Sequence, residues 1–368
     1  SMEAKPSELV RGDMNGDAAG CLFTLGELAM TDEVAVSSTA VVTLQTLATN
    51  SICIGGLRVD TPTATRGHAI AALGKLCLQR EELAKRSVEL FVLHLGDSEP
   101  LAVRNNALLV LGDLCVHYTA LVDRFVPCMA DLLRDSNELL RRQSAMVLAS
   151  LMSETFIKFR GPLLYRFAYA LSDPADSVRH LVECVFVRIL HRRDPAVFSH
   201  NFVDVVCALT GWAGHPSYQG ASGNERFSLL TSPSRRTLIY RFMLSLMTME
   251  QKFSVCQQIV TVFLAAFNDS EGMQHRLDLP QAEGEAGGQA LGDVLALLGC
   301  KEMRVCFSPK LAGQSEEDAE MEGPTGTSAA GAEATRGALS GLLRKVLRES
   351  IVPVLIQLKG LMEARRSP

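Results

Sequence analysis

Apolar residues recur at helical spacing along most of the chain, and the pattern repeats itself. Arg66, Arg104, Arg141 and Arg179 mark the repeat, at spacings of 38, 37 and 38 residues. A small or apolar residue stands three positions after each arginine, and apolar residues stand seven and ten positions after it. These offsets place the apolar side chains on one stripe of a helix. The pattern therefore predicts four equivalent amphipathic helices.

A second set of helices is expected between the first. Their predicted ranges are 33–49, 82–95, 119–133 and 156–171. Turns such as "RDSNELLR" and "SDPADSVR" offer Asp and Ser as helix N-caps. Pro127 and Pro162 fall inside predicted helices, where we expect them to cause kinks. A unit of helix, turn and helix every 37 or 38 residues predicts an all-α, HEAT-type helical-repeat solenoid.

Aspartates recur with the arginines, six or seven positions before each one. In stacked repeats, an arginine of one unit can pair with an aspartate of the next. We therefore expect a structural ladder instead of a binding site. Its predicted members are Asp97, Arg104, Asp135, Arg141, Asp173 and Arg179.

The period fades after residue 193, although apolar helices are still expected at 196–210, 235–248 and 251–267. Clusters of Gly, Ser and Pro, and later an acidic run, interrupt the pattern. The chain is therefore predicted to divide into four parts. These are a partly helical segment at 1–32, a solenoid at 33–267 with an inserted loop at 211–234, a largely disordered acidic linker at 268–335 with a short helix near 289–299, and a helical segment at 336–366 that packs on the stack.

Composition supports a globular protein, since 47% of the 368 residues are hydrophobic. No secretory signal and no membrane-spanning run is evident, so we expect a soluble intracellular protein without membrane contact. The ten cysteines form no C-x-x-C pair and are expected to be core residues in a reducing compartment. Cys300 and Cys306 are the pair to consider for a metal, but no nearby histidine completes a site, so we expect no metal.

Charge is unevenly distributed. The net charge is +5 over residues 140–193, +3 over 225–252 and −9 over 268–335. The candidate DNA-binding residues lie in the basic segments and are Arg188, Arg192, Arg193, Arg235, Arg236 and Arg241. The arginines at 188–193 lie at the end of a predicted helix, where the helix dipole alone can favour cations. Arg235 and Arg236 lie at the start of a predicted helix, where the dipole does not favour them. Two interpretations of these arginines remain open: they contact DNA phosphates, or they lie on a solvated face.

Catalytic signatures are missing from the sequence, so we expect no enzyme activity, no catalytic residue and no cofactor. Ser232 and Ser308 precede prolines near basic residues and are candidate phosphorylation sites. A phosphate on Ser232 is expected to neutralise the neighbouring arginines. Ser-Pro is also common in turns for geometric reasons alone.

Several long motifs resemble the D-type HEAT subunits of condensin, and of condensin II in particular. They include "VRNN" at 103–106, "GDLCVHYTALVDRFVP" at 112–127, "ETFIKFRGPLLYRF" at 154–167 and "ESIVPVLIQLKGLME" at 349–363. Family members are much longer, so the resemblance implies a fragment. It also implies a non-catalytic scaffold on chromosomes in the nucleus, acting in mitotic chromosome condensation. The implied partners are the kleisin subunit, through the complex an SMC ATPase pair, and double-stranded DNA or chromatin.

A HEAT adaptor that binds only proteins, of the transport or coat type, is the alternative. The two functions predict different arrangements of the arginines around 188–193 and 235–241. A shared concave surface favours DNA contact, whereas scattered arginines or arginines facing acidic neighbours favour the adaptor.

Overall fold

The structure is a computed structural model that describes residues 6–31, 36–50, 52–54, 57–159, 161–212, 232–264, 281–304, 345, 348–349 and 352–366. The chain divides into two compact units, Ser1–Val182 and Glu183–Pro368. The boundary falls within one helix, α10 (Asp176–Cys184).

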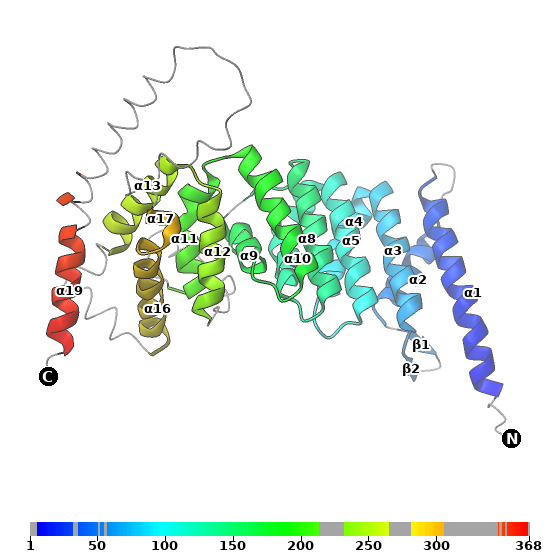
Figure 1. The fold of residues 1–368 in the computed structure, drawn as a ribbon. Helices are drawn as coiled ribbons and strands as arrows, with labels where there is room; N and C mark the ends of the chain where they lie inside the picture. Colours follow the sequence, from blue (N-terminus) through cyan, green and yellow to red (C-terminus); the bar gives the residue numbers. More distant parts are fainter. Residues whose placement is uncertain are drawn as a thin grey trace, which may run out of the picture. The chain divides into compact units, whose positions relative to one another are not determined.

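The first unit consists of helices and one short hairpin (Figure 1). Its longer helices are α1 (Pro6–Ala29), α2 (Ser38–Ala48), α3 (Thr63–Gln79), α4 (Glu81–Leu93), α5 (Leu101–His117), α8 (Glu138–Ser153) and α9 (Gly161–Ala170). Between α5 and α8 the chain forms α6 (Thr119–Val122), η1 (Asp123–Phe125), α7 (Val126–Asp131) and η2 (Leu132–Arg134). Two three-residue strands, β1 (Ile52–Ile54) and β2 (Leu57–Val59), pair antiparallel between α2 and α3. This hairpin was not predicted, but it occupies a connection and replaces no repeat helix.

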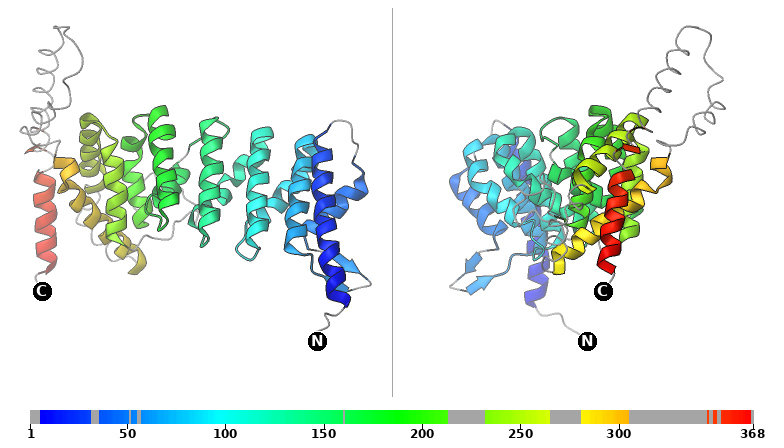
Figure 2. Two further views of the ribbon diagram at one scale, coloured as in Figure 1. Left: turned by 45° about the vertical axis from the view of Figure 1, so that its right-hand side comes forward. Right: turned by 90° about the vertical axis from the view of Figure 1, so that its left-hand side faces the viewer.

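Equivalent helices of successive repeats lie side by side. In the left view of Figure 2, α3, α5 and α8 follow one another in a row, and α3 packs on α5 as α5 packs on α8. Leu73, Leu111 and Leu148, which stand seven positions after the repeated arginines, are fully buried. The prediction of stacked helix pairs is therefore confirmed, because the predicted apolar stripes are the faces on which the helices pack.

Two prolines mark where the helices depart from the prediction. Pro127 lies in the first turn of α7, after a 3₁₀ turn, so the predicted helix 119–133 is broken instead of gently kinked. Pro162 likewise lies in the first turn of α9, which begins at Gly161 and not near 156. The preceding residues end α8: Thr155 has φ 69°, and the N–H of Phe156 donates to the carbonyl of Leu151 at 3.0 Å.

The second unit continues the pattern of helix pairs. After the π-helical turn η3 (Val185–His191), its helices are α11 (Val197–Thr210), α12 (Pro233–Ser245), α13 (Met249–Gln258), the π-helical η6 (Ile259–Leu264), α16 (Gln281–Leu298), α17 (Lys301–Arg304) and α19 (Val352–Arg366). Aromatic rings fill its core, including Phe186 stacked on Phe198 at 5.2 Å and Trp212 edge-on to Phe263 at 4.6 Å. Helix α16 packs on α11 and α12, and it begins eight residues before the short helix expected at 289.

Three of the predicted features are only partly described. Residues 213–231, most of the expected inserted loop, lie outside the described residues, as do 268–280 and 305–335 of the expected linker. In the C-terminal segment, Pro353 stands in the first turn of α19, and Ile356 of this helix is 65% exposed. Its side chain is thus not covered by the stack. Within the described part, no helix is both long and apolar enough to cross a membrane.

Candidate functional site

The repeated arginines of the first unit lie near the turns between the paired helices, where Arg66, Arg104 and Arg141 are buried and Arg179 is half-buried. Arg104 donates from Nε to the carbonyl of Leu95 at 3.0 Å and from Nη2 to Asp97 at 2.9 Å. The same nitrogen also pairs with Asp135 of the following repeat. One guanidinium therefore ties its own turn to the next turn.

Arg141 makes the same connection one repeat later. Its Nε and Nη2 bind the two carboxylate oxygens of Asp173 at 2.6 and 3.0 Å, as a bidentate fork. Its Nη1 donates to the carbonyls of Asp135 and Ser136 at 2.9 and 3.1 Å. Asp173 also accepts the N–H of Ala175 at 2.8 Å, which holds the turn before α10. Each aspartate thus shapes its own turn and receives the preceding arginine.

The ends of the row differ from its centre. Arg66 pairs with Glu99 at 2.7 Å and not with Asp97. Arg179 donates to the carbonyl of Pro174 at 3.1 Å and pairs with Asp176, which is exposed. The most deeply buried ion pairs of the row are therefore Arg104–Asp135 and Arg141–Asp173.

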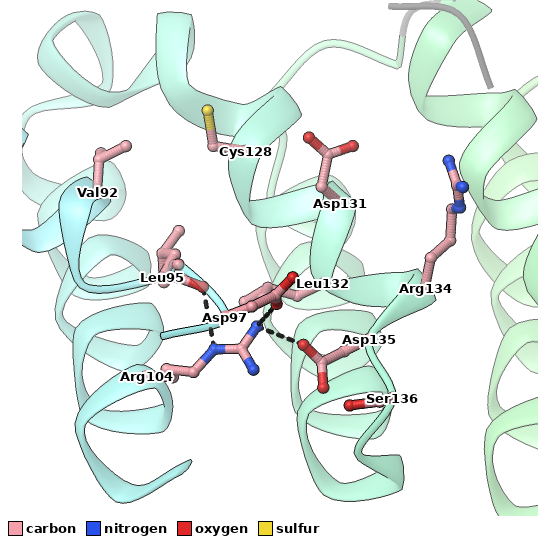
Figure 3. Close-up of a pocket in the computed structure, with 11 residues that line it drawn as sticks. Val92, Leu95, Asp97, Arg104, Cys128, Asp131, Leu132, Arg134, Asp135 and Ser136 are labelled. Carbon is pink, nitrogen blue, oxygen red and sulfur yellow. Dashed lines mark hydrogen bonds and ion pairs between the residues drawn. The ribbon is translucent and has the colours of Figure 1, made fainter. Parts of the chain in front are cut away.

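A hollow of about 620 Å³ lies beside Arg104 (Figure 3). The close-up shows Arg104, Asp97 and Asp135 together at its base, with Cys128 and Asp131 on α7 above them. Asp131 is in turn bound by Arg166 at 2.9 Å. These ionic groups pair with one another, and burial raises the pKa of the Cys128 thiol that lines the same hollow.

Arg236 was predicted to be a DNA-binding residue, and its surroundings show that this prediction was wrong. Its side chain is only 1% exposed, and it forms a bidentate pair with Asp293 of α16, from Nε at 2.5 Å and from Nη2 at 2.9 Å. The hydroxyl of Tyr240 donates to the same carboxylate at 3.1 Å. A guanidinium held in this way cannot reach a DNA phosphate, so Arg236 is no longer a candidate DNA-binding residue.

The sequence did contain a signal for this role. Arg236 is the fourth residue of α12, as Arg104 is of α5 and Arg141 of α8. Ile239, Met243 and Leu246 follow it at the same offsets of three, seven and ten residues. The equivalence was missed because 57 residues, instead of 37 or 38, separate Arg179 from Arg236.

The remaining candidate arginines have different surroundings. Arg188, Arg192 and Arg193 are exposed on and just after η3, with no ion pair among the described residues. Arg241 is half exposed, and its Nε lies 3.2 Å from Glu302. Arg235 is half-buried at the start of α12. Since Phe186 of η3 contacts Phe242 of α12 edge-on at 5.9 Å, η3 and α12 are neighbours.

The candidate phosphorylation sites differ in how far they are described. Ser232 is the N-cap of α12 and its Oγ lies 2.8 Å from that of Ser234. Ser308 lies outside the described residues.

The cysteines are possible nucleophiles and metal ligands because of the chemistry of their thiols. Burial raises the pKa of Cys77 to about 12 and that of Cys115 to about 11. Cys184, expected in the core, is exposed instead, and Cys306 lies outside the described residues. Over the described ranges, no group of three or more His, Cys, Asp or Glu side chains is placed to hold a metal ion.

Comparison with known proteins matches two family models. One, described as condensin-2 complex subunit D3-like HEAT repeats, covers residues 17–95. The other, described as non-SMC mitotic condensation complex subunit 1, covers residues 102–273. Together they span the helix pairs of the first unit and continue into the second, and they confirm the HEAT-repeat fold class.

Relatives agree with the family models. The chain is 30% identical to condensin-2 complex subunit D3 of Mus musculus over 97% of its own length, and 29% identical to subunit D3-L of Xenopus laevis over 94%. It is also 29% identical over 80% of its length to subunit CAP-D3 of Arabidopsis thaliana. The chain spans about a quarter of the length of these relatives, at 25%, 24% and 22% respectively. The repeat pattern, the helix pairs and these matches show that the chain belongs to the family of D3-type HEAT-repeat subunits of condensin-2.

Proposed function

We propose that this chain is a non-catalytic scaffold segment of condensin II that binds the kleisin subunit and contacts double-stranded DNA during mitotic chromosome condensation. It acts in the nucleus, on chromosomes, and meets the SMC ATPase pair only through the complex. Family membership supports the scaffold role, and the exposed Arg188, Arg192 and Arg193 support the DNA contact. Arg236 and Arg241 face Asp293 and Glu302, the arrangement that the protein-only adaptor predicts.

The observation that carries the DNA contact is the difference between two kinds of arginine. Arg104, Arg141 and Arg236 are buried and bound by carboxylates. Arg188, Arg192 and Arg193 are exposed and lie within a span of six residues, with no carboxylate bound to them in the described part of the chain. Unpaired guanidinium groups can bind backbone phosphates without reading base sequence, and each contact releases counterions.

Phosphorylation of Ser232 belongs to the same proposal, but the phosphate would neutralise one neighbouring arginine instead of two. Arg236 is occupied by Asp293, so a phosphate on Ser232 acts beside Arg235 alone. At the N-terminus of α12 the negative charge is also favourable to the helix dipole.

The test is DNA binding by the 368-residue chain as a function of salt, for the native protein and for the triple variant Arg188→Gln, Arg192→Gln, Arg193→Gln. Each lost phosphate contact lowers the salt slope by about 0.9, so the slope should fall by about 2.7. Affinity should fall equally for unrelated DNA sequences, since phosphate contacts carry no sequence information.

The matched control is the triple variant Lys85→Gln, Arg86→Gln, Arg124→Gln, which removes the same charge. Lys85 and Arg124 already pair with Glu81 and Glu89, at 2.9 Å each, so this variant should leave the salt slope unchanged. Equal losses in both triples would show a general charge effect. No loss in the first triple, with kleisin still bound, would favour the adaptor that binds only proteins.

A further inference from the structure

A second acidic contact in the second unit bears on the DNA-binding residues. Arg241 of α12 lies against α17, where its Nε is 3.2 Å from Oε1 of Glu302. The Arg241 side chain is 49% exposed and that of Glu302 is 27% exposed. Arg241 is therefore accessible to solvent but already has a carboxylate partner, whereas Arg188, Arg192 and Arg193 have none among the residues that the structure describes.

Glu302 is charged at neutral pH. Burial alone would raise its pKa, but hydrogen bonds from its own backbone and from Cys300, and the nearby guanidinium of Arg241, together lower it. Its second oxygen, Oε2, is buried and has no hydrogen-bond partner among the described residues. Arg241 is therefore the cation that compensates this partly buried carboxylate.

Arg241 lies on α12, a helix that also contacts η3, the element that carries Arg188. Phe242, the residue after Arg241, contacts Phe186 of η3, and Arg188 follows on η3 two residues later. A DNA backbone that follows the arginines of η3 would pass the neighbouring helix α12. A phosphate at Arg241 would there meet the negative charge of Glu302 a few ångströms away, and like charges at that distance repel.

We propose that Arg241 is a further phosphate-binding residue of this surface, and that Glu302 keeps it out of use in the native chain. The proposal rests on the DNA contact proposed above and adds the residue that limits it. Any event that removes the charge of Glu302 or displaces α17 from α12 would add one cation to the DNA-binding surface.

The test is a double-mutant cycle on the 368-residue chain, read as the salt dependence of binding to a DNA duplex. Glu302→Gln keeps an oxygen that can accept the hydrogen bond from Arg241 but removes the charge. It should raise the salt slope by about 0.9 and increase affinity roughly eightfold at 0.1 M salt, as one new phosphate contact does. Arg241→Gln alone should change neither quantity, and Arg241→Gln in the Glu302→Gln chain should return both to native values.

Glu250→Gln serves as the charge-matched control. Glu250 is exposed at the start of α13 and has no ion pair among the described residues, so its loss reports only the general effect of one charge. The proposal is overturned if Glu302→Gln gains no more than Glu250→Gln, or if Arg241→Gln alone weakens binding. A native chain without salt-dependent DNA binding would instead overturn the proposed function itself, so the two failures are distinguishable.

Discussion

An arginine in this protein takes its role from its partner more than from its place in the sequence. Arg141 has five donor groups and uses four of them within the protein, two on Asp173 and two on turn carbonyls, counting Nη1 twice. Because both partners are buried, the pair is not screened by solvent, and the loss of one partner leaves an uncompensated charge inside the protein.

Asp173→Asn tests how much stability is lost when Arg141 is left without its buried carboxylate partner. The side chain keeps its shape but loses the charge that Arg141 faces, so the free energy of unfolding should fall by about 3 kcal/mol. Asp176→Asn is the control, because Asp176 is exposed in its pair with Arg179 and an exposed pair contributes about 1 kcal/mol or less. Urea denaturation of both variants measures the difference, and equal losses would argue against a buried ladder.

At the scale of helices, close packing between neighbouring repeats depends on small residues. Gly74 of α3 faces Val110 of α5, and a Cβ at position 74 would lie 2.5 Å from one methyl of that valine. Valine is stiff about χ1 in a helix, so it cannot easily move away. The two helices would have to separate to accept a larger side chain.

Gly74→Ala should therefore destabilise the protein by about 1 to 3 kcal/mol, as overpacking does, even though alanine is the better helix former. Gly20→Ala in α1 provides the opposite case, since nothing lies within 4 Å of its added Cβ. That variant should be neutral or more stable by up to about 1 kcal/mol. Thermal unfolding distinguishes them, and a stabilised Gly74→Ala would contradict the close approach of α3 and α5.

Helix positions were predicted well where the apolar period was uninterrupted. The expected helices 82–95 and 196–210 correspond to α4 and α11 within two residues at each end, because their apolar faces are also their packing faces. The hairpin β1–β2 has strands of only three residues, too short to give an alternating pattern. Pro162 was misplaced because a proline in the first turn and one in the interior of a helix look alike in sequence.

The site was predicted less well, for a physical reason that Arg236 illustrates. Charge counting along the sequence finds cations, but it does not reveal a carboxylate that reaches them from 57 residues away, as Asp293 does. The same holds for Glu302, which lies 61 residues after Arg241. Arg188, Arg192 and Arg193 stay candidates because their side chains are exposed, a property that helix periodicity alone does not give.

For the whole molecule, the proposed function needs two separable sets of arginines. One set holds helices together, as Arg236 does between α12 and α16, and the other meets DNA. Replacing Arg236 alone would leave the buried Asp293 carboxylate with the Tyr240 hydroxyl but without its cation. Replacing both members of a buried ion pair by apolar residues is often tolerated. The double variant Arg236→Met, Asp293→Leu therefore removes this arginine without leaving an uncompensated charge inside the protein.

The most direct test compares the salt slope of DNA binding for Arg192→Gln and for Arg236→Met, Asp293→Leu, with folding checked by circular dichroism. The account predicts that the first loses about 0.9 in slope and that the second keeps the native slope. A loss of slope in the folded second variant, with none in Arg192→Gln, would contradict it, because the buried arginine would then be the one that meets DNA.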